Sequence, residues 1–408
     1  MSSPVDSHVG SARQTPLFDK CRAFDLPQRA HAAGVYSYFR VIESAQEPEV
    51  WIDGRRFIML GSNNYLGLTN HPKVKEAAIA AVQRYGTGCG GSRFLNGTLD
   101  LHTRLEEKLA AFIGTAGAVV FSTGFQVNLG VISCLVDRDD IIYLDKQDHA
   151  CIFDGARLSM GEVRRFRHND TDDLLRLINT DANGSAGKLI VVDGVFSMEG
   201  DIAPLPQIVA IARNHGAAIL LDDAHGIGVL GPNGRGTAEH FGLEAQIDLV
   251  MGTFSKSLAS VGGFVCGDSS VIQYIRHKAR SFIFSAAPAP ACAAAASAAL
   301  DILQAEPQRR EALWKNTRFM LEEFRRLGFD TGESQTPVIP LIIGEDINAL
   351  IFARRLHDAG LFVNAVVPPA TPRGRALIRT SYMATHTQQQ LCRALEIFEK
   401  VGRELAVI

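Results

Sequence analysis

The sequence predicts an α/β fold, with a mostly parallel sheet in a large domain followed by a smaller C-terminal α+β domain. Short apolar runs rich in β-branched residues lack the polar alternation of half-exposed strands, which is typical of a parallel sheet covered on both faces. Segments with apolar residues three or four positions apart separate these runs and favour helices. The runs are residues 118–121, 141–144, 189–192, 218–221 and 249–251.

The expected helices of the large domain follow from the same spacing, and they are residues 72–85, 101–112, 172–178 and 205–214. After residue 290 the pattern changes. The expected elements there are helices 291–304 and 307–327, a strand 338–343, a helix 347–359, a strand 376–379 and a closing helix from 387. The predicted division is an N-terminal tail and segment (1–54), a large α/β domain (55–287) and a small α+β domain (288–408).

The composition is that of a globular enzyme and argues against several other classes. A net charge of -3 without a long basic run does not favour nucleic acid or anionic lipid as a partner. Residues 1–15 are polar and are expected to be a loose tail rather than a secretory signal, and the alanine-rich segment 288–300 is too short and weakly apolar to span a bilayer. The seven cysteines are scattered without a Cys-x-x-Cys pair, so we expect no disulfide framework, no metal site and a cytoplasmic location.

Polar residues follow each of the five predicted strands, at residues 122–125, 145–149, 193–197, 222–225 and 252–257. In a parallel sheet these carboxyl ends meet at one edge, where ligands bind. The small residues at 122–125 open a helix whose free N–H groups could hold a phosphate. The pattern therefore predicts one site that combines all five segments.

The chemistry that unites these residues is that of pyridoxal phosphate (PLP), which needs a lysine for its aldehyde and a carboxylate at its ring nitrogen. Lys256, among hydroxyl residues, suits the first role, and Asp222 at a strand end suits the second. Taken singly, a solvated lysine, an aspartate N-cap and core histidines explain the same residues. Residues 86–91 match G-x-G-x-x-G, but a helix precedes them, so a dinucleotide site is not expected.

The chain resembles the α-oxoamine synthases, which are fold-type I (aspartate aminotransferase-like) PLP-dependent transferases that join an amino acid to an acyl-CoA thioester. The resemblance extends from about residue 35 to the C-terminus. It depends on the motifs SNNYLG (62–67), GGSRFLNGT (90–98), FSTGF (121–125), DGVFSM (193–198), DDAH (222–225), GTFSK (252–256) and LIR (377–379). It implies a homodimer with its active site at the subunit interface.

The resemblance also implies how the cofactor would be held. Lys256 would form the Schiff base and move the proton of the substrate's α-carbon. His149 would stack on the cofactor ring, Asp222 would pair with the ring nitrogen and His225 with the ring oxygen. Further contacts, at the phosphate and beside the ring, would come from Gly124, Phe125, Thr253, Ser255 and Ser197, with Ser285 reaching the phosphate from a second subunit.

The substrate carboxylate would be held by Arg379 with help from Asn64, because a guanidinium matches a carboxylate with two parallel hydrogen bonds. The substrate's α-carbanion would attack the thioester, CoA would leave and CO2 would be lost. These roles are what the resemblance implies for the matching positions.

Within the family, the glycine-rich motif at 91–98 and the segment NAVVPPATP at 364–372 are most similar to bacterial serine palmitoyltransferases. This similarity implies condensation of L-serine with palmitoyl-CoA to 3-ketodihydrosphingosine. Asn63, Asp223 and the pair Cys89 and Gly90 depart from that pattern. The alternatives are an 8-amino-7-oxononanoate synthase or glycine C-acetyltransferase that uses alanine or glycine, and more distantly an aminotransferase. A catalytically silent subunit is disfavoured, because Lys256 is present.

Overall fold

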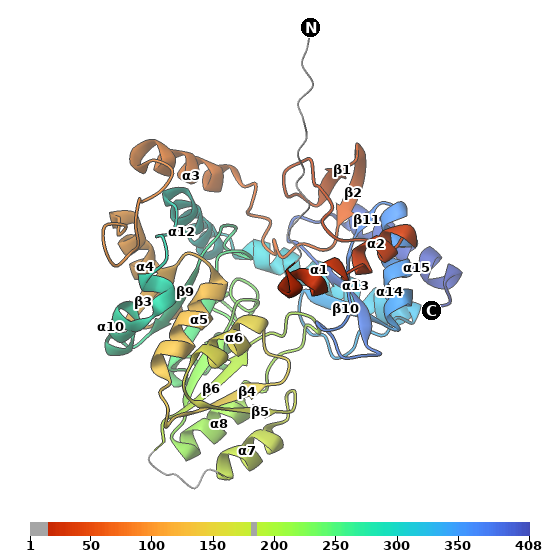
Figure 1. Ribbon diagram of the computed structural model, residues 1–408. Helices are drawn as coiled ribbons and strands as arrows, with labels where there is room; N and C mark the ends of the chain where they lie inside the picture. The colour runs from red at the N-terminus through yellow and green to blue at the C-terminus, as the bar shows by residue number, and fades with distance from the viewer. Residues whose placement is uncertain (1–14, 181–185) are drawn as a thin grey trace.

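The computed structural model describes residues 15–180 and 186–408, so most of the tail expected at residues 1–15 lies outside the described residues. Figure 1 shows a seven-stranded sheet with its helices in one part of the molecule and two small sheets with α13, α14 and α15 in the other. The fold-type I arrangement expected from the sequence is confirmed.

The large sheet has the strand order β3-β9-β8-β7-β6-β4-β5. Six strands run in one direction, and β9 runs antiparallel to its neighbours β3 and β8. The bounds are β3 (Gly117–Phe121), β4 (Ile141–Asp145), β5 (Glu162–Phe166), β6 (Lys188–Asp193), β7 (Ala218–Asp222), β8 (Leu249–Thr253) and β9 (Gly263–Gly267). The sequence analysis did not predict β5 or β9. The sequence of β5 contains three charged residues, and β9 begins and ends with glycine, so neither is a continuous apolar run.

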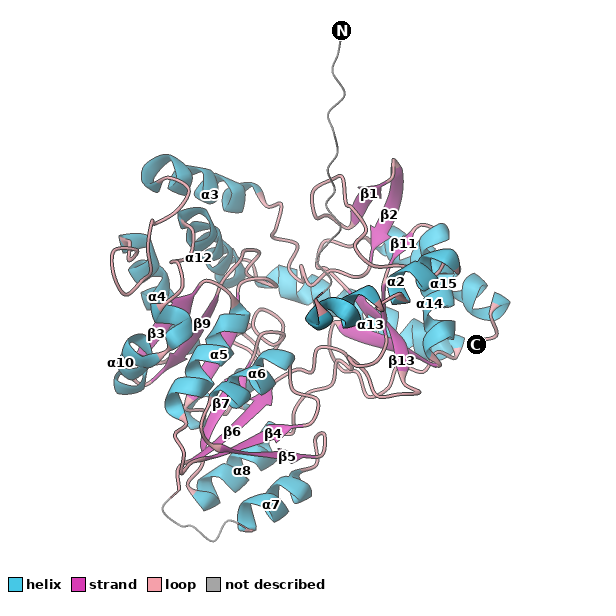
Figure 2. Cartoon of the chain, viewed as in Figure 1, coloured by secondary structure: helices cyan, strands magenta, loops and turns pink. Residues whose placement is uncertain are grey.

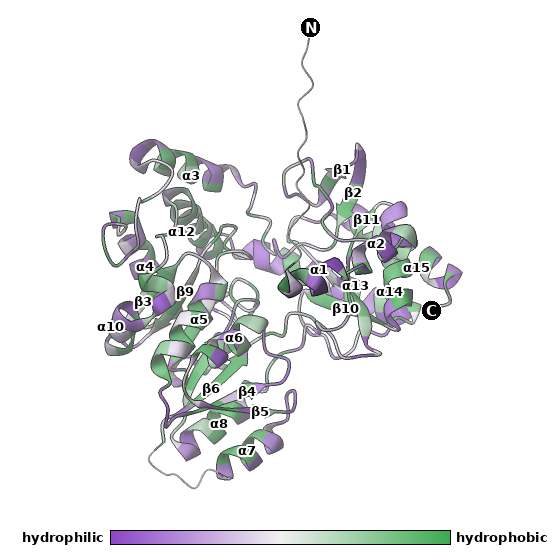
Figure 3. Ribbon diagram, in the orientation of Figure 1, coloured by the Kyte–Doolittle hydropathy of each residue, from purple (hydrophilic) through white to green (hydrophobic). Residues whose placement is uncertain are grey.

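The continuous apolar runs are explained by burial on both faces of this sheet, because successive strand residues point to opposite sides. In β6, Ile190 packs in the core on one face and Val191 in the core on the other. Figure 2 shows helices on both sides of the strands, and Figure 3 shows the strands as mainly hydrophobic. One core includes α4, α8 and α12, and the other includes α5, α6 and α10.

The helices of this part are α3 (Pro72–Tyr85), α4 (Asp100–Ile113), α5 (Gly124–Leu135), α6 (Ala150–Leu158), α7 (Thr171–Asn179), α8 (Leu205–His215), α9 (Thr237–Phe241), α10 (Ser269–Lys278), α11 (Arg280–Ile283) and α12 (Pro290–Ala305). A short 3-10 helix, η2 (Glu244–Gln246), precedes β8. The four helices predicted for the large domain are confirmed, to within two residues at each end.

The C-terminal part is built on an antiparallel sheet of β10 (Val338–Gly344), β13 (Ala376–Ser381) and β12 (Asn364–Val366). The helices α13 (Pro307–Leu327), α14 (Asp346–Asp358) and α15 (Gln388–Glu404) pack together with it. Their shared core contains an aromatic cluster of Phe324, Phe329, Phe352 and Phe398.

The N-terminal segment joins this C-terminal part. The hairpin of β1 (Glu49–Ile52) and β2 (Arg55–Met59) pairs through β2 with β11 (Leu361–Phe362). Before it lie η1 (Pro16–Phe18), α1 (Asp19–Arg22) and α2 (Leu26–Ala32). In addition α12, which follows residue 287, packs against α3 and α4. The division 1–54, 55–287 and 288–408 stays a proposal, and these contacts favour grouping β2 with the C-terminal part and α12 with the large one. Within the described residues, we find no helix with the length and apolarity needed to cross a membrane.

Candidate active site

The carboxyl ends of five strands of the large sheet enclose a cavity of about 410 Å³. Because β3, β4, β6, β7 and β8 run in the same direction, the polar residues after each strand meet at this edge. The site residues predicted from the sequence that line the cavity are Gly124, Phe125, His149, Ser197, Asp222, His225, Thr253, Ser255 and Lys256. The other three, Asn64, Ser285 and Arg379, do not line it.

Lys256 follows β8, in the loop that closes the cavity. Burial lowers the pKa of its amine, and the negative charges of Asp222 and Asp193 oppose this effect. A lysine with a lowered pKa deprotonates more readily, and the neutral amine is the form that attacks an aldehyde. Lys256 therefore has the property that PLP chemistry requires of its lysine, and its role as the Schiff-base residue stays a prediction.

Asp222 ends β7 and is buried, with both of its carboxylate oxygens accepting hydrogen bonds. Asn128 Nδ2 donates to Oδ2 at 2.6 Å, and the backbone N–H of Ala224 donates to Oδ1 at 3.1 Å. Asn128 also donates to Cys151 Sγ at 3.1 Å. The sequence prediction missed Asn128, although an amide residue within the apolar stretch 127–132 of α5 was an available signal.

His149 caps the N-terminus of α6 (Ala150–Leu158) and lines the cavity. Its backbone N–H donates to Asp193 Oδ2 at 2.8 Å, and its ring nitrogen accepts from the backbone N–H of Cys151 at 3.3 Å. Desolvation by the surrounding protein lowers the pKa of the ring, against the charge of Asp222, and the charge of Lys256 lowers it further. A neutral imidazole that lines the cavity and is held by these hydrogen bonds suits stacking on a flat ring.

His225 lines the cavity and is buried, and its Nδ1 lies 2.7 Å from the hydroxyl of Tyr65. Burial and the charge of Lys256 hold the pKa of His225 well below its usual value, so the ring is neutral. Burial raises the pKa of Tyr65 to about 12, so its hydroxyl stays protonated. The Tyr65 O–H therefore donates a hydrogen bond to Nδ1 of His225. A neutral imidazole has one N–H group, and since Nδ1 accepts from Tyr65, this N–H is at Nε2 of His225. From there it can donate a hydrogen bond to an oxygen atom.

A cradle for an anion lies at the N-terminus of α5. Thr123 caps this helix by accepting from the backbone N–H of Gln126, and Gly124 is its first residue. A Cβ atom on Gly124 would lie 2.6 Å from Thr253 Oγ1, so any side chain would push the Thr253 hydroxyl out of its place. Thr253 Oγ1 and Ser255 Oγ lie 2.9 Å apart beside it. Free N–H groups and hydroxyls in this arrangement suit a phosphate.

Ser285, the residue expected to reach the phosphate from a second subunit, lies close to this helix within the same chain. Its hydroxyl accepts from Gln126 Nε2 at 3.1 Å. The contact places Ser285 at the first turn of α5, and its role toward a phosphate stays a prediction.

Arg379 on β13 is buried and reaches from the C-terminal part to the loop that carries Ser197. Its Nε donates to the carbonyl of Ser197 at 2.6 Å, and its Nη2 donates to Asn63 Oδ1 at 3.0 Å. Asn64 instead shapes its own turn, since its amide donates to Thr69 Oγ1 at 2.6 Å and accepts from the backbone of Leu68 at 3.0 Å. The structure thus brings Asn63, not Asn64, to the guanidinium, and the carboxylate role of Asn64 remains a prediction.

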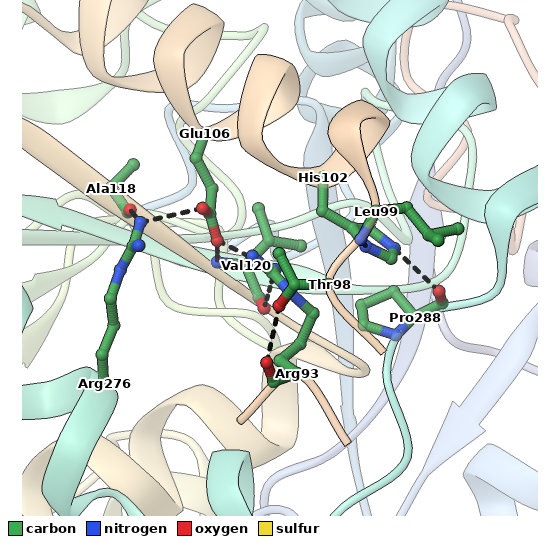
Figure 4. A network of polar contacts seen from close by, with 9 residues as sticks. All are labelled: Arg93, Thr98, Leu99, His102, Glu106, Ala118, Val120, Arg276 and Pro288. Atoms are coloured by element: carbon green, nitrogen blue, oxygen red, sulfur yellow. Dashed lines mark hydrogen bonds and ion pairs between the residues drawn. The ribbon is translucent and has the colours of Figure 1, made fainter. Parts of the chain in front are cut away.

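The glycine-rich motif is anchored by a buried ion cluster (Figure 4). Glu106 on α4 accepts from Arg93 at 2.9 Å and from Arg276 at 2.8 Å. It also accepts from the backbone N–H of Val120 at 2.9 Å. Because β3 is the edge strand of the sheet, Glu106 takes the place of a missing neighbouring strand.

Comparisons with known proteins agree with this geometry. The family model for aminotransferases of class I and II matches residues 55–398. A serine palmitoyltransferase of Bacteroides thetaiotaomicron is 50% identical over 392 residues, which cover 96% of this chain and 99% of the relative. An 8-amino-7-oxononanoate synthase of Symbiobacterium thermophilum is 46% identical over 376 residues, which cover 92% and 96%.

Among solved structures, a serine palmitoyltransferase from S. paucimobilis with a bound PLP-myriocin aldimine has a TM-score of 0.93 and 40% identity, and covers 97% of this chain and 100% of that chain. The resemblance drawn from the motifs is confirmed. The chain therefore belongs to the class I and II aminotransferase family and, within it, to the α-oxoamine synthases, which are PLP-dependent acyltransferases.

Proposed function

We propose that this protein condenses L-serine with a long-chain acyl-CoA such as palmitoyl-CoA, with release of CO2 and CoA. The observation that carries the proposal is the single cavity that Lys256, Asp222, His149 and His225 line together. The relative that is 50% identical along nearly its whole length is a serine palmitoyltransferase, which supports the choice of substrates.

The residues of the cavity fit PLP. Because Gly124 has no side chain, the Thr253 hydroxyl keeps its place beside the N-terminus of α5, an arrangement that suits a phosphate, and Lys256 and Asp222 line the same cavity. When bound, the cofactor supplies an electron sink for the pair left on the substrate's α-carbon. Asp222 would keep the ring nitrogen protonated, and Asn128 would hold its carboxylate in place.

The other residues would bind and orient. Lys256 would bind the aldehyde and, once displaced by the substrate amine, would remove the α-proton. His149 would present its flat ring to the cofactor, and His225 would donate from Nε2 to the ring oxygen. Arg379 would hold the serine carboxylate, and its bond to the Ser197 carbonyl would orient the guanidinium for that task.

A second cavity of about 500 Å³ shares His149 and Ser197 with the first and is a candidate for the acyl thioester. Its apolar lining includes Phe153, Met198 and Pro369. Apolar walls next to the reacting atoms suit the start of an acyl chain. This placement supports a large acyl donor in the proposed reaction.

We further propose a homodimer in the cytoplasm. The exposed apolar side chains of Leu95 (78% exposed) and Phe284 (75%) lie in the glycine-rich motif and in the segment before α12. A second copy of the chain would cover such surfaces. Sedimentation equilibrium of the purified protein should give twice the mass of one chain, and a monomer at micromolar concentration would contradict this.

The proposed reaction is tested by thiol release from the PLP-loaded protein, with glycine, alanine and serine each combined with acetyl-, pimeloyl- and palmitoyl-CoA. Release with serine and palmitoyl-CoA alone is the expected result. Lys256→Ala is the control, and it should lose both thiol release and the visible absorbance of the bound cofactor. Unchanged absorbance in this variant would contradict the assignment of Lys256.

A second candidate function is that of an 8-amino-7-oxononanoate synthase. Asn63, which resembles that branch in the sequence, contacts Arg379 at the proposed carboxylate site. The relative from Symbiobacterium thermophilum supports the same branch at 46% identity. Thiol release with alanine and pimeloyl-CoA, and not with serine and palmitoyl-CoA, would establish this alternative. None of the relatives described above is an aminotransferase, and we do not propose that reaction.

A further inference from the structure

His168, just beyond the end of β5, lies between two carboxylates outside the cofactor cavity. Its Nδ1 is 3.0 Å from Asp145 Oδ1, and its Nε2 is 2.9 Å from Asp201 Oδ2. A carboxylate accepts hydrogen bonds and cannot donate them, so both ring nitrogens must carry hydrogen. The geometry is therefore that of an imidazolium bonded on both sides.

Asp145 belongs to the turn that carries His149. It ends β4 four residues before His149, and its Oδ1 also accepts from the backbone N–H of Gln147 at 2.8 Å. Its Oδ2 accepts from the backbone N–H of Asn169 at 2.7 Å. The carboxylate therefore fixes the path of the chain from β4 toward His149 and joins it to the segment after β5.

Asp201 belongs to the loop that carries Ser197. Its backbone carbonyl accepts from the N–H of Phe196 at 3.0 Å, which closes this loop next to Ser197. The ring of His168 also packs edge-on against Phe196, with centroids 4.4 Å apart. His168 thus contacts the loop twice, through the Asp201 carboxylate and through the ring of Phe196.

We propose that His168 is a positioning residue of the active site, which sets the spacing between His149 and Ser197 by binding Asp145 and Asp201 at the same time. His149 and Ser197 line the cofactor cavity and also the adjacent cavity of about 500 Å³. The distance between these two residues therefore sets the width of the opening between the two cavities. Of the measurements below, only kcat depends on the proposed condensation reaction.

The charge of the cluster gives the proposal a distinctive pH signature. Burial alone would lower the pKa of His168, but the hydrogen bonds and charges of Asp145 and Asp201 outweigh it and raise the pKa to about 9. The contribution of His168 to stability is therefore fully present below pH 6.5, its ordinary pKa, and is lost as the pH rises through about 9. The other charged groups that line the space around His168 are Glu199, Asp330, Glu333 and Arg375.

The first test compares His168→Gln with His357→Gln in the PLP-loaded protein. His357 is a matched control, because it is buried in α14 and bonds the backbone carbonyl of Val363 at 3.0 Å, away from both cavities. The visible circular dichroism of the bound cofactor reports its orientation without any turnover. His168→Gln should change this signal and lower kcat by about 10- to 100-fold, as misplaced groups do. His357→Gln should lower the melting temperature and leave both readouts unchanged.

The second test uses Asp201→Asn, whose side-chain oxygen can still accept from His168 while the negative charge is gone. In the unmodified protein, the visible circular dichroism should change with a midpoint near pH 9. The midpoint should move to lower pH in Asp201→Asn, and this transition should be missing in His168→Gln.

Two results would overturn the inference: an unchanged midpoint in Asp201→Asn, or equal behaviour of the two His→Gln variants. If no substrate pair releases thiol but the dichroism behaves as expected, the proposed function fails and the positioning role stands.

Discussion

Replacing Glu106 by glutamine tests whether the buried ion cluster supports the edge of the sheet. Glu106 is 3% exposed and is the acceptor shared by Arg93, Arg276 and the backbone N–H of Val120. Glutamine has the same shape, but its NH2 group would replace one carboxylate oxygen. If the oxygen stays with Arg93 and Val120, the NH2 group faces Arg276, and two donors meet without an acceptor (Figure 4).

The expected loss follows from the burial of the charges. Removing one partner of a buried ion pair leaves an uncompensated charge and costs about 3–5 kcal/mol. Arg276 keeps a hydrogen bond to the carbonyl of Ala118 at 2.9 Å, and its side chain is 32% exposed, so part of its charge can be solvated. We therefore expect Glu106→Gln to lower the free energy of unfolding by about 3 kcal/mol, at the lower end of this range.

The assay is equilibrium unfolding of the full chain in urea, followed by far-UV circular dichroism and fluorescence. The matched control is Glu107→Gln, the same substitution on the next residue of α4, where the side chain is exposed. This control should change the free energy of unfolding by no more than about 0.5 kcal/mol. Equal midpoints for the two variants would refute the view that Glu106 replaces a neighbouring strand.

Gly124→Ala should weaken PLP binding to the apoprotein by about 10-fold or more, because the new methyl group would clash with Thr253 and displace its hydroxyl from the anion cradle; equilibrium dialysis measures this affinity. Asn128→Leu removes the 2.6 Å hydrogen bond to Asp222 and should cost about 1–3 kcal/mol of cofactor binding in the same assay. Arg379→Lys keeps the charge but loses the planar pair of donors, so the KM for the amino acid should rise by about 10- to 100-fold with a smaller change in kcat, as initial rates would reveal.

The control for the glycine variant is Gly88→Ala, since no atom lies within 4 Å of a Cβ at that position. Equal PLP affinities of the two alanine variants would contradict the cradle. Unaltered PLP affinity in Asn128→Leu would mean that Asp222 needs no support from α5. A large fall in kcat with an unchanged KM in Arg379→Lys would contradict a role in binding the substrate carboxylate.

The sequence by itself determined five of the seven strands of the large sheet and most of the residues that line the cofactor cavity. Apolar runs of three or four residues indicated strands buried on both faces, and the polar residues that follow them indicated the edge where the site lies. In a parallel sheet the carboxyl ends of the strands meet, so the order along the chain was enough to bring Lys256, Asp222 and His149 together.

Only the tertiary structure decided which side chains support these residues. Spacing along a loop does not specify where a side chain points, so the sequence could not show that Asn63 rather than Asn64 contacts Arg379. The pairing of β2 with β11 joins residues about 300 positions apart, and local patterns carry no signal for it. Likewise no pattern in the sequence shows which groups His168 and Glu106 contact. Their partners come from separate segments, and their roles exist only once folding excludes water from around them.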